Sequence, residues 1–144
     1  MKKQLYFLLF VIVSVGSTGT VFLHITTNKS EINDAFIKGN GKLLSSFLNE
    51  MVEFNIEENE GTFSRIQAES ILINFFFNNP PKTFEINQEG KTNDNADFVI
   101  ATYTSVHGCK YRVYYKLKKQ TNSGNDEQIM ELNITKNKQC QSKI

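Results

Sequence analysis

A strict alternation of apolar and polar side chains near residue 110 constrains the fold of this chain more than any other feature. Between Lys110 and Lys118 every second side chain is apolar, in the order Tyr111, Val113, Tyr115 and Leu117. Successive side chains of a strand point to opposite faces, so this segment predicts a strand with one covered face and one wet face. The rest of the chain must therefore supply elements that cover one side of a sheet.

Four further segments predict strands, because they are rich in β-branched and aromatic residues and are bounded by turn residues. They are residues 51–56, 83–88, 97–105 and 128–135, joined in part by the turn-rich connections 90–95 and 120–126. Phe98 to Ala101 is apolar on both faces, which favours a central strand. Short connections of this kind predict an antiparallel sheet of four or five strands.

The covering elements are predicted to be helices that precede most of the strands. Ser64 and Gln67 form a capping-box pattern that opens the strongest helix. Its core face has helical spacing and consists of Ala68, Ile71, Leu72, Phe75 and Phe76, before a stop at Asn78–Pro81. Two shorter helices are expected, one from the N-cap Ser30 to Gly39 and one from the N-cap Asn40 to Asn49. Helices first and a meander of strands last predict an α+β fold.

The N-terminal segment predicts export from the cytoplasm. Two lysines precede a run from Gln4 to Asn28 that has no ionised side chain, which is typical of a secretory signal. Cleavage at Ser17-x-Gly19 and retention as a membrane anchor of roughly 20 residues stay open as alternatives. No cysteine precedes Cys109, so we expect a periplasmic or extracellular protein that is not a lipoprotein. The domain organisation is then a signal or anchor over 1–28, one α+β domain over 29–137 and a tail over 138–144.

Composition excludes strong electrostatic steering towards polyanions. The 144 residues include 16 basic and 15 acidic side chains. Loss of Lys2 and Lys3 with the N-terminal segment leaves 14 basic residues, so the net charge is close to zero. We therefore expect no nucleic-acid partner, and a membrane contact only through an uncleaved N-terminal segment.

Four stretches of the chain resemble a family of exported proteins known as domain of unknown function 4783. The matching stretches are 36–43, 63–69, 75–84 and 111–114, and the order and spacing agree from about Ile32 to Lys136. The resemblance implies the cystatin-like, nuclear-transport-factor-2-like fold, in which a curved sheet wraps helices into a cone with a pocket at its open end. It implies no activity, so no functional residue can be transferred.

The implied pocket gives the first set of candidate site residues. Tyr111 and Tyr115 have core-face parity, and we expect apolar lining from the helices by Phe36, Phe75 and Phe76. The alternative is that these aromatic residues only fill the core. No catalytic motif or cofactor fingerprint is present, and no acidic residue or histidine holds a predicted core position. The sequence favours a non-enzymatic binding or interaction domain for an apolar ligand or a protein, with a small-molecule enzyme that uses the cone pocket as the alternative.

A second apolar stripe gives the candidate interaction face. Ile66, Ile73 and Phe77 lie about 160° from the centre of the core stripe on the helix that follows Ser64. Either a hairpin over residues 54–63 covers this stripe, or it contacts a partner or a second copy in a homodimer.

The two cysteines predict a disulfide. An exported domain meets an oxidising compartment, and Cys109 and Cys140 both have core-face parity. A register that opposes Leu117 to Leu132 also opposes the two cysteines, whereas a shorter register leaves them diagonal. A metal site with His107 lacks a fourth ligand and the spacing of a zinc module, so we assign no metal; two free thiols are the remaining alternative.

Overall fold

The computed structural model describes residues 28–119, 127–137 and 140, so the predicted export segment and most of the C-terminal tail lie outside the described residues. The described helices are α1 (Asn28–Lys38), α2 (Gly41–Ser46) and α3 (Arg65–Asn78). The strands are β1 (Leu48–Ile56), β2 (Asn59–Ser64), β3 (Pro81–Lys91), β4 (Asp97–Ser105), β5 (Lys110–Lys119) and β6 (Glu127–Lys136). None of these helices combines the length and apolar character that a membrane span requires.

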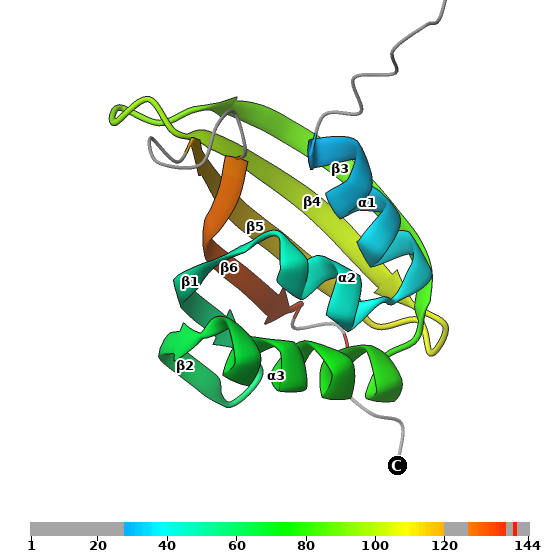
Figure 1. Ribbon diagram of the computed structural model, residues 1–144. Helices are drawn as coiled ribbons and strands as arrows, with labels where there is room; N and C mark the ends of the chain where they lie inside the picture. The colour runs from blue at the N-terminus through cyan, green and yellow to red at the C-terminus, as the bar shows by residue number, and fades with distance from the viewer. Residues whose placement is uncertain (1–27, 120–126, 138–139, 141–144) are drawn as a thin grey trace, which may run out of the picture.

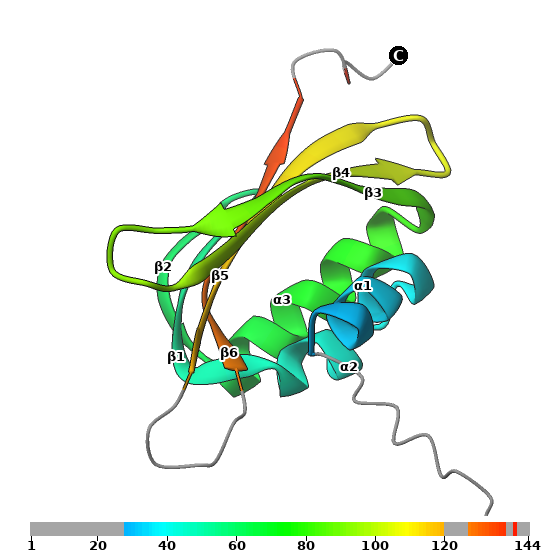
Figure 2. The ribbon, with the colours of Figure 1, turned by 90° about the horizontal axis from the view of Figure 1, so that it is seen from above.

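The strands form one curved sheet in the order β2-β1-β6-β5-β4-β3, and all three helices pack on its concave face (Figure 1, Figure 2). The α+β fold class is therefore confirmed. The predicted strand count is wrong, because the described sheet has six strands. The prediction of an antiparallel sheet needs a second correction, since β1 pairs with β6 in parallel while the other neighbours are antiparallel.

The additional strand is β2, which pairs with β1 through a tight hairpin; a hairpin over residues 54–63 was expected, but its second arm was not predicted as a strand. Its sequence Asn-Glu-Gly-Thr-Phe-Ser is polar and contains glycine, a composition depleted in strands. Pairing with β1 at the sheet edge supplies its hydrogen bonds without requiring burial. The parallel pairing of β1 with β6 could not be predicted either, because the alternation of apolar and polar side chains is the same in parallel and antiparallel strands.

The start of β1 differs from the prediction as well. The expected helix from Asn40 to Asn49 ends at Ser46, and β1 begins at Leu48, where a strand was expected only from residue 51. The Phe47 carbonyl accepts a hydrogen bond of 2.7 Å from the Ile129 amide of β6. Pairing with β6 therefore ends the helix early. Helix propensity depends on the local sequence and cannot predict a contact with a distant strand.

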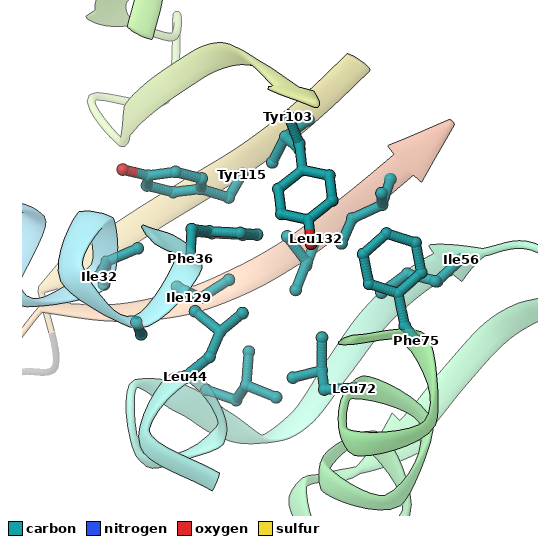
Figure 3. Close-up of a cluster of buried hydrophobic side chains, with 14 of the residues drawn as sticks. Ile32, Phe36, Leu44, Ile56, Leu72, Phe75, Tyr103, Tyr115, Ile129 and Leu132 are labelled. Atoms are coloured by element: carbon teal, nitrogen blue, oxygen red, sulfur yellow. The ribbon is translucent and has the colours of Figure 1, made fainter. Parts of the chain in front are cut away.

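The core lies between the concave face of the sheet and the helices (Figure 3). The four alternating side chains of β5 face the helices as predicted, with exposed fractions of 2% or less: Tyr111, Val113, Tyr115 and Leu117. The capping box at Ser64 and Gln67 is present in both directions. Its two hydrogen bonds fix the start of α3 directly at the end of β2.

Cys109 and Cys140 form a disulfide, with their Cα atoms 5.0 Å apart. The pairing predicted from the sequence is therefore present in the structure. The register that was expected to produce it is wrong, because Leu117 pairs with Ile129 after a bulge rather than with Leu132. This is the shorter register, in which the cysteines were expected to be hard to bridge.

The chain direction after β6 explains why the disulfide still forms. The Asn137 amide donates to the Lys110 carbonyl at 2.9 Å, and the Cys140 amide donates to the Asn137 carbonyl at 3.1 Å. These bonds turn the chain beyond β6 and bring Cys140 within disulfide reach of Cys109. Turn geometry beyond the strand, and not strand register, therefore sets the distance between the cysteines.

Candidate functional site

The second apolar stripe of α3 is exposed. Ile66 and Phe77 are 80% and 81% exposed, and Ile73 is 47% exposed. Arg65–Asn78 lies across the helical side of the sheet with its other face turned to the core. The β1–β2 hairpin therefore does not cover the stripe, which leaves a partner or a second copy as the alternatives.

A groove of about 450 Å³ lies beside the C-terminal half of this stripe. One wall is the turn between α1 and α2, and the other is α3; the lining residues are Lys38, Gly39, Asn40, Gly41, Lys42, Ile73, Phe76 and Phe77. This volume is in the range of ordinary binding clefts, although the groove is open along one side. We call the stripe and this groove together the α3 face.

Two glycines make the wall of the groove. Gly39 has a φ of 60°, which lets the chain leave α1 in a left-handed conformation. A Cβ atom on Gly41 would lie 2.7 Å from the Ile73 backbone nitrogen, a distance that real Cβ atoms do not tolerate. The absence of a side chain at Gly41 therefore lets α2 approach the backbone of α3 and fixes the width of the groove.

The groove carries positive charge. Lys38 and Lys42 are exposed at its rim, and its lining contains no carboxylate. Lys38 forms an exposed ion pair with Asp34 at 3.3 Å, which is weak because both side chains are solvated. On α3 itself the one acidic side chain, Glu69, accepts a hydrogen bond of 2.8 Å from the Ser45 hydroxyl of α2. The two lysines could not be identified from the sequence as site residues, because only the turn between α1 and α2 places them beside α3.

The five predicted pocket residues lie together in the interior and pack against one another. Phe36, Phe75, Phe76, Tyr111 and Tyr115 have exposed fractions of 4% or less. The ring of Phe75 lies 5.2 Å from that of Tyr111 and 5.5 Å from that of Phe76. Figure 3 shows Phe36, Phe75 and Tyr115 pointing into one continuous cluster. Their role in ligand binding stays a prediction; of the five, Phe76 also lines the groove of the α3 face.

Comparison with known proteins identifies the family. The family model for the domain of unknown function DUF4783 matches residues 29–135. The chain belongs to the DUF4783 family. A DUF4783 protein from Bacteroides fragilis is 30% identical, with 74% of this chain and 96% of that chain aligned and a TM-score of 0.66. One from Bacteroides ovatus is 27% identical over 75% of this chain and 94% of that chain, with the same TM-score.

A more distant structure, from Nostoc punctiforme, is a domain of unknown function with a cystatin-like fold. It is 15% identical, covers 76% of this chain and 72% of that chain, and has a TM-score of 0.57. At this identity the likeness concerns the fold alone. The cystatin-like, nuclear-transport-factor-2-like fold implied by the sequence resemblance is thereby confirmed for this DUF4783 chain. Among curated proteins no match to the chain was found.

A hydrogen-bond cluster closes the C-terminal end of α3 in this DUF4783 domain. The Tyr111 hydroxyl donates to the Asn79 side-chain oxygen at 2.7 Å, and the Tyr103 hydroxyl donates to the Asn79 carbonyl. The Asn79 side-chain amide nitrogen in turn donates to the Phe75 carbonyl at 3.2 Å and to a carboxylate oxygen of Glu57 at 3.3 Å. Burial raises the pKa of both tyrosines above the ordinary value. The cluster satisfies its polar groups internally, which is typical of a structural network.

Asn79 and Tyr103 were not identified as special from the sequence. Asn79 was noted only as part of the helix stop before Pro80. Tyr103 follows a segment that is apolar on both faces, so the sequence does not indicate which face of the sheet its side chain occupies. The spacing of Tyr103 and Tyr111 does not predict that both hydroxyls bind Asn79, which lies 24 and 32 positions earlier in the chain.

The hydroxyl of Tyr115 differs from the other two. It is buried and has no hydrogen-bond partner among the described residues, and burial raises its pKa. The Tyr115 ring is stacked against that of Phe36, with 6.4 Å between the two ring centroids. An unpaired buried hydroxyl is costly in a protein core, so Tyr115 is the one predicted pocket residue with unused hydrogen-bonding capacity.

The described part of this DUF4783 chain offers little for acid–base or metal chemistry. No Asp, Glu or His within it is buried, and no group of three or more metal-ligating side chains is arranged to hold an ion there. On the outer face of the sheet, Lys116 pairs with Asp94 at 3.0 Å. The pKa of Asp94 falls to about 2, chiefly through hydrogen bonds from Thr92 and then Lys116. That exposed pair is charge-balanced and does not form a basic surface.

Proposed function

We propose that this chain is an exported, non-enzymatic interaction domain that binds a protein partner through the α3 face. The observation that supports the proposal is the row of three exposed apolar side chains, Ile66, Ile73 and Phe77, beside a concave groove. Contiguous apolar surface on a soluble domain is typical of binding sites. Solvation of these side chains is unfavourable, and their contact with a partner would remove that penalty.

Site-specific photocrosslinking tests the proposal in cells. A photoreactive amino acid at position 77 is expected to form a covalent adduct with a partner, because this side chain is 81% exposed. The matched control is position 51, where Met51 is 53% exposed on β1, on the face of the sheet opposite the helices. Introducing Ile73→Asp together with the probe at 77 should abolish the adduct.

The result distinguishes several outcomes. An adduct of twice the chain mass would identify a second copy as the partner. Equal labelling from positions 77 and 51, or an adduct that persists in the Ile73→Asp background, would contradict binding through the α3 face. Circular dichroism of each variant confirms that the fold is retained before the adducts are compared.

The export part of the proposal rests on the two lysines and the apolar run that precede residue 28. Mass spectrometry of the protein recovered from the periplasm or medium tests it. A mass that lacks residues 1–19 would establish cleavage after Gly19, and a full-length mass in the membrane fraction would establish an anchor. Recovery of the full-length chain in the cytoplasm would contradict export.

A second candidate function rests on the unpaired hydroxyl of Tyr115. A small apolar ligand with one hydrogen-bonding group would satisfy this hydroxyl between α1 and the sheet, beside Phe36. In this case Tyr115→Phe should weaken ligand binding without destabilising the ligand-free protein. If the substitution lowers stability instead, the hydroxyl has a structural role and this second candidate fails.

A further inference from the structure

The lining of the groove in the α3 face contains two lysines and no carboxylate, and Asp34, which pairs with Lys38, lies outside it. Lys38 and Lys42 stand at the groove rim, and Lys82 follows Pro81, which packs against the same α1–α2 turn. The whole chain has a net charge of only +1, so this concentration of lysines is local. Charge complementarity therefore favours an occupant that carries carboxylates or other anionic groups next to its apolar contacts.

The length of the stripe indicates the shape of the occupant. Ile66 and Ile73 are seven positions apart, and Phe77 follows four positions later. These intervals are those of a seam between two packed helices, and 11 positions correspond to about 16 Å along a helix axis. A single small molecule does not span this distance, whereas three turns of an amphipathic helix do.

A second copy of the chain fits the charges poorly. A twofold axis near Phe77 would bring the lysine rims of two copies together. An axis near Ile73 would pair the helices antiparallel, and α3 of the other copy carries one acidic side chain, Glu69, and one basic side chain, Arg65. Neither arrangement supplies a net negative charge against the lysine rim, which disfavours a homodimer through this face.

The attachment point of the N-terminal segment disfavours a membrane surface. The chain enters the domain at Asn28, whose side chain donates to the Glu127 carbonyl at 3.0 Å, and the adjacent Lys29 pairs with Asp97 at 3.3 Å. These contacts fix the beginning of α1, whereas the groove lies at its other end, next to Lys38. Figure 1 shows the start of α1 at the far side of the helical layer from α3. The groove therefore lies at the end of α1 opposite to the point where a retained anchor would join the domain.

From these observations we infer that the α3 face binds an acidic amphipathic helix of another protein, an inference that rests on the proposed function. The apolar side of that helix contacts Ile66, Ile73 and Phe77, and its carboxylates lie against Lys38 and Lys42. The apolar contacts exclude water, and the lysines set the sign of the charge that the partner must carry.

A pair of synthetic peptides tests the sign of the charge. The first is an amphipathic peptide of about 14 residues with leucines at helical spacing and glutamates on its flanks, and the second has lysine in place of every glutamate. Fluorescence anisotropy with the full oxidised chain at low salt should show at least roughly tenfold tighter binding of the glutamate peptide, with the difference shrinking as salt rises. The double variant Lys38→Glu/Lys42→Glu should reverse this preference, whereas Lys110→Glu, at an exposed site on β5, should not.

Each outcome separates this inference from the proposed function. Equal affinity for both peptides, or failure of the glutamate peptide to bind, overturns the acidic partner; the photocrosslink from position 77 would then still test the α3 face itself. Binding of phosphatidylglycerol vesicles but of neither peptide would assign the face to a membrane. A dimer in sedimentation that Phe77→Asp dissociates would assign it to a second copy. Either result overturns the inference.

Discussion

Phe76 and Phe77 are neighbours in sequence, yet one is 4% exposed and the other is 81% exposed. The same contrast runs along both faces of α3, which are similarly apolar. One face, with Ala68, Leu72, Phe75 and Phe76, packs on the sheet and the other helices; the opposite face, with Ile66, Ile73 and Phe77, does not. The comparison teaches that two apolar faces of one helix can differ completely in burial, and that only the neighbouring elements decide which face is covered.

The largest effect is expected from a substitution in the buried face. Phe75→Ala should lower the free energy of unfolding by about 3–5 kcal/mol, because it opens a cavity among Phe76, Tyr103 and Tyr111. The matched variant Phe77→Ala should stay within about 0.5 kcal/mol of the natural protein. Urea denaturation measures both values. Equal losses for the two variants would mean that the two faces of α3 contribute equally to the free energy of unfolding, which would contradict the comparison.

Loss of the disulfide should separate stability from binding. The bond between Cys109 and Cys140 has a sequence separation of 31, and the double variant Cys109→Ser/Cys140→Ser should lose about 3–4 kcal/mol in the chain-entropy model. The photocrosslink from position 77 should persist, since neither cysteine lies on the α3 face. Thiol titration of the denatured natural protein provides the control, because two reactive thiols would show that the bond does not form.

Alkaline pH should lower the stability of the domain through its buried tyrosines. Burial raises the pKa of Tyr103, Tyr111 and Tyr115 above the ordinary value of 10. These hydroxyls contribute fully to stability below pH 10; above it the unfolded chain releases their protons first, so stability falls as pH rises towards the folded-state pKa values. The urea midpoint should drop as the pH rises above about 10.

The same measurement on Tyr115→Phe sharpens this prediction. This variant keeps the ring but removes the hydroxyl that has no partner among the described residues, so it should be no less stable at neutral pH and should lose less stability at high pH. An alkaline drop identical to that of the natural protein would show that Tyr115 does not contribute to it.

The smallest effect is expected on the exposed face. Ile66→Ser should change stability by less than about 0.5 kcal/mol, because the side chain is 80% exposed and packs on nothing that its loss would disturb. The same substitution should reduce the yield of the position-77 photocrosslink, since it removes one end of the apolar stripe. A clear loss of stability would show that Ile66 belongs to the core.

The candidate site could be predicted from the sequence only in part. Helical spacing identified Ile66, Ile73 and Phe77 as a second stripe, because the period of a helix is fixed. The groove beside them could not be predicted, since it depends on Gly41 packing against the backbone of α3 and on Lys38 and Lys42 reaching the same place from another helix. A local sequence pattern cannot predict such contacts, because they join residues that are far apart in the chain.

The sequence by itself determined the α+β class, the start of α3 at Ser64 and the core face of β5. Each follows from interactions within a few residues, such as the capping box and the two-residue period of a strand. Only the tertiary structure decided the parallel pairing of β1 with β6, the edge strand β2 and the exposure of Phe77. These features depend on which distant segment supplies hydrogen bonds or cover, and that choice is made by the packing of the whole chain.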